Sequence, residues 1–143
     1  MYKGYKIRCR AIIMHEGKLL VVKHKERSQS YVLPGGKMDP GEDPLICVRR
    51  EIIEELGVEP KGFKLAYVYT WKKDGKQNLD FMFSISNGDE FLNLKDKKAT
   101  HAFELFDIRW ISKDEYILVR PAPIYEDFKI GKMDFDQVKF ISQ

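Results

Sequence analysis

The sequence has few cysteines, no long apolar run and no strong excess of one charge. Its two cysteines, Cys9 and Cys47, are too few for a disulfide framework, so we expect both to be reduced and buried. No stretch approaches the roughly 18 consecutive apolar residues that a membrane span requires. The charged N-terminal segment, MYKGYKIRCR, lacks the apolar core of a secretory signal. Together these absences predict a cytoplasmic protein with no membrane partner.

The net charge and the length of the chain further limit the possible partners and the number of domains. The net charge of +3 is mild, and the basic residues are spread along the chain. No RNA- or DNA-binding motif accompanies them, so we expect no stable nucleic-acid partner. A chain of 143 residues can bury one core but is short for two domains of ordinary size. We therefore expect a single domain over residues 1–143.

Hydrophobic patterning predicts an α/β fold with a mixed sheet. Apolar runs bounded by turn residues predict strands at residues 7–14, 19–24, 31–33, 64–72, 79–86 and 106–111, the first two as a hairpin. The C-terminal segment is harder to interpret: a short helix is expected after Ser112, a turn or helix near 124–129 and a strand at 137–142. Residues 35–43 are rich in glycine and predict a loop.

A longer helix is expected at residues 44–56, between an N-cap at Asp43 and Gly57, and one face of it is acidic. At about 100° per residue, Glu51, Glu54 and Glu55 fall within an arc of roughly 100°. These like charges repel one another and oppose the dipole at the helix C-terminus. Hard oxygen ligands that converge on one point suit Mg²⁺ or Mn²⁺. On the helix alone, a solvated acidic face remains the alternative to a metal site.

The other side of the same helix is apolar over a wider arc than one packing partner requires. The apolar residues are Leu45, Ile46, Val48, Ile52, Ile53 and Leu56. Either the C-terminal segment from residue 121 covers the excess, or a second subunit does. A homodimer is therefore one of two open alternatives.

Residues 36–58, GKMDPGEDPLICVRREIIEELGV, resemble the signature of the Nudix hydrolases. That signature reads G-x5-E-x7-R-E-U-x-E-E-x-G-U, where U is aliphatic, and this chain meets every specified position. The matching residues are Gly36, Glu42, Arg50, Glu51, Ile52, Glu54, Glu55, Gly57 and Val58. The resemblance implies an α/β/α sandwich with a mixed β-sheet, in which the signature forms a loop, a helix and a loop.

The resemblance also implies roles for residues of the signature. The implied metal ligands are Glu51, Glu54, Glu55 and the backbone carbonyl of Gly35. Glu51 would in addition lie close to the attacking water. Arg50 is grouped with the catalytic residues because its fork can hold a glutamate of the signature in place, and Glu42 would steady the loop.

The implied activity is pyrophosphate hydrolysis by attack of water on phosphorus. The substrate class is a nucleoside-diphosphate-linked compound, such as a nucleotide, an ADP-ribose-like compound or a dinucleotide. Mg²⁺ or Mn²⁺ would neutralise the phosphate oxygens and activate the water. The alternative is a Nudix-fold nucleotide-binding sensor or regulator without useful turnover. An intact set of Glu51, Glu54 and Glu55 favours the enzyme, since a pure binding module has no need of them.

Glu104 is a candidate outside the signature. Many members of the family carry an acidic residue shortly before a strand such as IRW, where it serves as a metal ligand or general base. The alternative is a solvated loop glutamate. Asp89, Glu90 and Asp107 are rivals for the same role.

Candidate substrate-binding residues come from strands and their ends. Lys23 lies just past an apolar run and could contact phosphate, although a charged rim is an equal alternative. Tyr31, Trp71 and Phe83 are candidates for stacking on a base, and core packing is the alternative for each. The glycine-rich loop is not a P-loop, because no Gly-Lys-Ser/Thr follows it.

Overall fold

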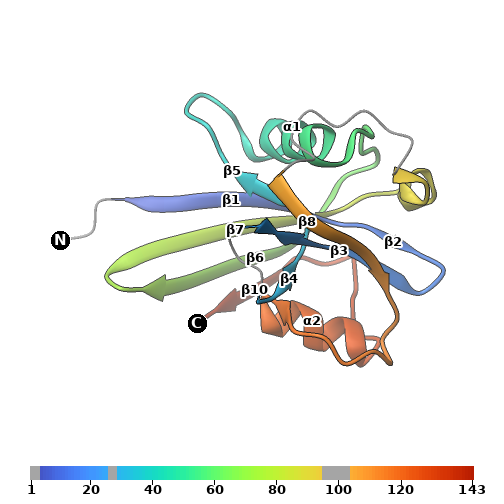
Figure 1. The fold of residues 1–143 in the computed structure, drawn as a ribbon. Helices are drawn as coiled ribbons and strands as arrows, with labels where there is room; N and C mark the ends of the chain where they lie inside the picture. Colours follow the sequence, from blue (N-terminus) through green and yellow to red (C-terminus); the bar gives the residue numbers. More distant parts are fainter. Residues whose placement is uncertain (1–3, 26–28, 95–103) are drawn as a thin grey trace.

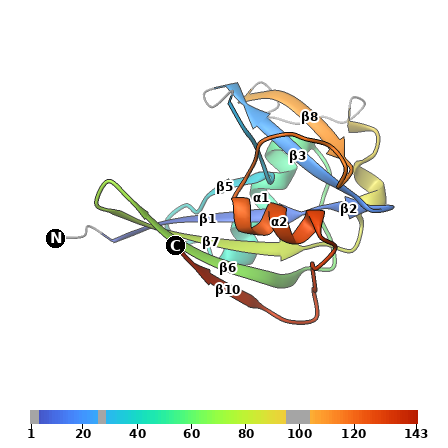
Figure 2. The same cartoon turned by 90° about the horizontal axis from the view of Figure 1, so that it is seen from below.

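The structure is a computed structural model, and it describes residues 4–25, 29–94 and 104–143. Within these residues, two mixed β-sheets lie between two α-helices, α1 (Pro44–Leu56) and α2 (Ala122–Lys129) (Figure 1). Figure 2 shows α2 lying on the side of the strands opposite to α1. The expected α/β/α sandwich is confirmed, with two mixed sheets where one was predicted. None of the helices in the described ranges is both long and apolar enough to cross a membrane.

The first sheet has the strand order β10-β6-β7-β1-β5. Its strands are β1 (Tyr5–Ile12), β5 (Gly35–Lys37), β6 (Lys64–Lys73), β7 (Lys76–Ser84) and β10 (Lys139–Ser142). Strands β6 and β7 form an antiparallel hairpin, while β1 runs parallel to β7 and β10 parallel to β6. The central strand β7 is therefore flanked by partners on both sides.

The second sheet has the order β2-β3-β4-β9, and β8 pairs with the other side of β3. Its strands are β2 (Met14–His15), β3 (Lys18–His24), β4 (Tyr31–Val32), β8 (Leu105–Ile111) and β9 (Val119–Arg120). A short 3₁₀-helix, η2 (Gly88–Phe91), follows β7. Each sheet contributes one face to a core below α1 and the opposite face to a core around α2.

The ends of α1 follow from local chemistry. The Asp43 carboxylate accepts a hydrogen bond from the backbone N–H of Ile46 at 2.9 Å, and Pro44 occupies the first turn. Gly57 adopts a left-handed conformation, with φ of 74°, and its N–H donates to the carbonyl of Ile53. The predicted bounds of this helix, residues 44–56, are confirmed.

The other predictions had mixed outcomes. The strands predicted at 31–33, 64–72, 106–111 and 137–142 and the helix near 124–129 are confirmed with small shifts of their ends. The predicted helix after Ser112 is wrong. There the Glu115 carboxylate accepts from the Ser112 N–H at 2.7 Å, which closes a turn instead. The strand predicted at 79–86 begins earlier, at Lys76, and ends at Ser84.

The predicted hairpin of residues 7–14 with 19–24 is only partly right. Only β2 pairs with β3, whereas β1 pairs along its length with β7. Residues 35–37, predicted as loop, form β5 and pair with the other edge of β1. Both differences come from partners distant in the sequence, which local patterning does not report.

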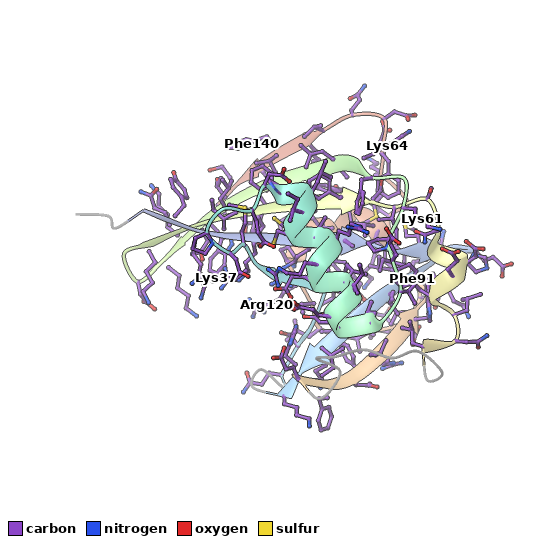
Figure 3. All side chains as sticks on the ribbon, turned by 90° about the horizontal axis from the view of Figure 1, so that it is seen from above. Lys37, Lys61, Lys64, Phe91, Arg120 and Phe140 are labelled. Atoms are coloured by element: carbon purple, nitrogen blue, oxygen red, sulfur yellow. The ribbon has the colours of Figure 1, made fainter. Side chains whose placement is uncertain are left out.

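Half of the apolar arc of α1 is exposed. The side chains of Leu45, Ile46 and Ile53 are 48%, 54% and 37% exposed, whereas Val48 and Ile52 are fully buried. Helix α2 lies on the other side of the sheets and β10 is the edge strand of the first sheet, so the C-terminal segment leaves this arc uncovered (Figure 1). The first of the two alternatives for covering it is therefore wrong. Figure 3 looks down on α1, with Lys37 to one side of the helix and Phe91 to the other.

Candidate functional site

The acidic face of α1 faces the protein interior. Cys47 and Glu55 of this face are buried, and Cys47 donates through its thiol to the carbonyl of Gly36 at 3.7 Å. Glu55 is 3% exposed, and its Oε2 has no hydrogen-bond partner. The solvated acidic face that was the alternative does not describe Glu55.

The electrostatic environment of Glu55 is unfavourable for an ordinary carboxylate. Burial raises its pKa to about 8, and the negative charge of Glu51 adds to the shift. The charge of Arg10 and a backbone hydrogen bond from Gly35 act in the opposite direction. His24 lies nearby, with its Nε2 at 4.0 Å from Oε1 of Glu55. A buried acid with an unpaired oxygen is costly unless a cation or a proton completes it.

Arg50 holds the remaining acids of the signature. Its guanidinium donates to both oxygens of Glu42, at 2.6 and 2.9 Å, and this fork lowers the pKa of Glu42. It also donates to Glu51 at 2.9 Å and to Glu54 at 3.2 Å. A further bond, to the carbonyl of Lys37 at 3.1 Å, fixes the preceding loop. Arg50 therefore contacts Glu42, Glu51 and Glu54 at once.

Two glycines let the backbone approach this acidic group. A Cβ on Gly36 would lie 2.5 Å from the carboxylate of Glu51. A Cβ on Gly35 would lie 2.1 Å from the carbonyl of Cys9, and its φ of 143° is one that other residues rarely adopt. The space beside Glu51 thus exists because the residue that faces it has no side chain.

These features fit a divalent cation. The candidate donors, Glu51, Glu54, Glu55 and the carbonyl of Gly35, would supply hard oxygens, the chemistry that Mg²⁺ and Mn²⁺ prefer. Within residues 4–25, 29–94 and 104–143, the structure does not bring three acidic, histidine or cysteine side chains together in a group that could hold a metal ion. In this arrangement Glu51 and Glu54 both accept hydrogen bonds from Arg50. The unpaired Oε2 of Glu55 is the oxygen that a cation would satisfy.

Glu104 directly precedes β8 and is exposed. Its negative charge is among those that raise the pKa of both Glu51 and Glu55, which places it near the acidic group. Burial is the largest cause of the raised pKa of Glu51. Two of the three rivals are engaged elsewhere: Asp107 accepts from the hydroxyl of Tyr31, and Glu90 accepts from the amide of Asn87.

A cavity of about 900 Å³ opens on the face of the first sheet that also packs against α2. It is lined by Arg8, Arg10, Gln29, Ser30, Val32, Tyr69, Trp71, Lys72, Lys73, Asp80, Arg120, Pro121, Ala122 and Gln143. Arg10 is its link to the acids of α1, since its charge lowers the pKa of both Glu55 and Asp80. A second cavity, of about 430 Å³, lies beyond the end of α1, and the predicted catalytic and metal-binding residues line neither cavity.

The predicted substrate-binding residues do not come together. Trp71 lines the cavity. The Lys23 ammonium lies 5.1 Å from the centre of the Tyr31 ring, and Tyr31 is itself buried. Phe83 packs edge-to-face on Phe63 in the core below α1, on the other face of the sheet.

Sequence reasoning missed the basic and acidic residues of the cavity. Arg8 and Arg10 alternate along β1, and Asn78 and Asp80 alternate along β7, so all four point to one face of the first sheet. Polar residues at every second position of a central strand were the signal that could have found them. The Arg8 guanidinium donates to Asn78 at 3.0 Å, and Arg10 donates to the carbonyl of Leu33 at 2.8 Å.

Known proteins share this arrangement. A model of the NUDIX domain matches residues 5–128. A Nudix hydrolase from Nitrosomonas europaea is 25% identical, with 91% of this chain and 92% of that chain covered and a TM-score of 0.69. A MutT Nudix hydrolase from Burkholderia pseudomallei is 23% identical, with coverages of 86% and 96% and a TM-score of 0.69. An ADP-ribose pyrophosphatase from Streptococcus suis is 18% identical, with coverages of 94% and 98% and a TM-score of 0.64.

The fold and these matches define a hydrolase that acts on pyrophosphate bonds. The chain belongs to the Nudix family, whose domain spans most of its length. The family predicted from residues 36–58 is thereby confirmed.

Proposed function

We propose that this protein is a metal-dependent pyrophosphohydrolase of nucleoside-diphosphate-linked compounds. The observation that carries the proposal is the unpaired, buried oxygen of Glu55 beside Glu51. The charge of Arg10 links it to a cavity in which five basic residues, Arg8, Arg10, Lys72, Lys73 and Arg120, outnumber one acid. The basic residues of the cavity would attract a polyanionic substrate, and the acids of α1 would attract a cation. The ADP-ribose pyrophosphatase from Streptococcus suis is consistent with this class of substrate.

Each residue of the proposed site has a distinct task. Glu51, Glu54, Glu55 and the carbonyl of Gly35 would hold Mg²⁺ or Mn²⁺. When bound there, the cation would neutralise phosphate oxygens and make water a better nucleophile. Arg50 keeps Glu42 and Glu51 in place through the hydrogen bonds described above. Glu104 would accept the proton of the attacking water, and Arg10 would hold a phosphate oxygen at the junction of cavity and acids.

The domain is proposed to include the whole chain. The family match ends at residue 128, but β10 (Lys139–Ser142) pairs with β6 and extends the same sheet. The side chain of Lys139 also forms an ion pair with Asp127 of α2 at 2.9 Å. Residues 129–143 therefore support the fold that carries the cavity.

Removal of the cation is expected to abolish activity. Excess EDTA should stop release of phosphate in an assay coupled to a phosphatase, and Mg²⁺ or Mn²⁺ should restore it. The substrate panel is dinucleotide polyphosphates, ADP-ribose, sugar nucleotides and nucleoside triphosphates. Undiminished turnover in EDTA would exclude the metal-dependent mechanism. Binding of these compounds without turnover in Mg²⁺ and Mn²⁺ would identify a nucleotide sensor instead.

The proposed base gives a separate prediction. Glu104→Gln is expected to lower kcat by about 10²- to 10⁴-fold, the usual effect of removing a positioned general base. The concentration of Mg²⁺ that gives half-maximal activity should change little, because Glu104 is not among the proposed ligands. Asp107→Asn, on the strand that follows Glu104, is the matched control, since its carboxylate is engaged by Tyr31. A loss within about threefold for Glu104→Gln would show that it is only a loop residue.

A further inference from the structure

Strand β8 contains a β-bulge opposite the end of β3. The two strands lie side by side in the second sheet (Figure 2), and their register shifts between Lys23 and His24. Lys23 lies opposite Asp107, whereas His24 lies opposite Leu105, so Phe106 is the extra residue on β8. A bulge turns a side chain out of the regular alternation of a strand, and bulges are common next to active sites.

The bulge leaves an aromatic ring on the surface. Phe106 is 66% exposed, whereas Leu105 is buried in the core below α1 and Asp107 accepts from the hydroxyl of Tyr31. The Lys23 ammonium lies 5.9 Å from the centre of the Phe106 ring and 5.1 Å from the centre of the Tyr31 ring. These cation–π contacts orient the Phe106 ring and still leave most of it open to solvent.

The exposed ring lies at the edge of the proposed catalytic site. Glu104, the proposed base, is two residues before Phe106. On the facing strand, the Nε2 of His24 is 4.0 Å from Oε1 of the buried Glu55. A group attached to phosphates that lie at these acids can therefore reach the Phe106 ring.

The aromatic rings that line the cavity of about 900 Å³ offer less open surface. The Arg8 guanidinium lies 5.9 Å from the centre of the Trp71 ring, and the indole nitrogen is buried. Tyr69 is 7% exposed, and its hydroxyl donates to Gln143 at 2.6 Å. A planar group that binds by stacking thus meets an open ring at Phe106 rather than in the cavity.

We propose that Phe106 forms the binding site for the nucleobase of the substrate, which stacks on the exposed ring. The proposal rests on the function proposed above, because it takes the phosphates of the same substrate to lie at the acids of α1. Stacking attracts a base to an aromatic ring and buries ring surface that is now exposed to water. Every base has a flat aromatic face, so this contact selects for the presence of a base and tolerates different bases.

Calorimetric titration with AMP and with ribose 5-phosphate in excess Mg²⁺ tests the proposal. The two compounds differ by the base, and neither contains a pyrophosphate bond, so binding is measured without turnover. AMP is expected to bind about tenfold or more tightly. Phe106→Ala should lower the affinity for AMP about fivefold or more, the usual loss when a stacking ring is removed, and leave that for ribose 5-phosphate within about twofold. Phe106→Trp should retain the affinity for AMP, since indole also stacks on a base.

Phe140→Ala is the matched control, because Phe140 is 64% exposed on β10 of the first sheet and should not affect AMP binding. Thermal unfolding verifies that each variant keeps the fold. Equal affinity of the wild-type protein for AMP and ribose 5-phosphate, absence of binding included, would overturn the proposal. So would a Phe106→Ala protein whose affinity for AMP is unchanged or falls together with that for ribose 5-phosphate. Binding that depends on the base and on Phe106, without hydrolysis of any compound in the panel, would uphold this site and refute the proposed function alone.

Discussion

Replacement of Glu51 by glutamine is expected to lower kcat by about 10³-fold or more, roughly 4 kcal/mol of transition-state stabilisation. The side chain is the central acid of the α1 face and lies against Gly36, where no other side chain would fit. Glutamine keeps the volume but removes the charge proposed to hold the cation and orient the water. Steady-state kinetics with saturating Mg²⁺ and one substrate of the panel measures the effect.

Glu59→Gln is the control for this variant. Glu59 is a half-exposed acid that follows α1 and pairs with Arg49 at 2.7 Å, outside the proposed site. Its loss removes the same charge and should leave kcat within about twofold, since exposed ion pairs contribute little. A fully active Glu51→Gln protein would refute the catalytic interpretation of the whole signature.

Glu55→Gln is expected to make the metal-free protein more stable and the enzyme far less active. The pKa of Glu55 rises from 4.5 to about 8 on folding, so the folded state binds this proton more tightly than the unfolded chain. The stability that this gives is fully present below pH 4.5 and is lost as the pH rises through about 8. Glutamine remains neutral, so at pH 8 the free energy of unfolding should increase by on the order of 4 kcal/mol.

Thermal unfolding with and without Mg²⁺ measures both sides of this prediction. The melting temperature of the wild-type protein should rise in excess Mg²⁺, because the cation binds only the folded arrangement of acids. Glu55→Gln should start from a higher melting temperature in EDTA and gain little from Mg²⁺, with kcat reduced about 10²-fold or more. Glu90→Gln, on η2, is the control. A metal-free Glu55→Gln protein that is less stable than wild type would show that the carboxylate has a structural role.

The signature predicted the acidic part of the site because its chemistry is local. Helix periodicity places Glu51, Glu54 and Glu55 on one face whatever the rest of the chain does, and the cap at Asp43 sets where that face begins. The hydrogen bonds from Arg50 to Glu42 and Glu51 also lie within this segment. Local periodicity was therefore sufficient to predict which acids share one face of α1.

The cavity was not predicted because its residues meet only through the pairing of distant strands. Arg8 and Asp80 become neighbours when β1 lies parallel to β7, a register that neither strand shows on its own. For the same reason, the sequence could not show which strand aromatics face the cavity and which face the core. Trp71 and Phe83 are both strand aromatics, but only the sheet decides that Trp71 faces the cavity and Phe83 the core.

The parallel pairing of β1 with β7 also sets an order for folding during synthesis. Among the described strands β1 is synthesised first, yet its long partner β7 begins only at Lys76. Until β7 has been synthesised, the apolar face of β1 and the buried face of α1 lack the sheet against which they pack, and closing so large a loop is slow. A nascent chain that ends before Lys76 should therefore bind chaperones and fail to bury Cys9 and Cys47. We expect both thiols to react with a labelling reagent in stalled chains that end before Lys76. Their reactivity should fall in longer chains, once β7 can pair with β1 and complete the first sheet.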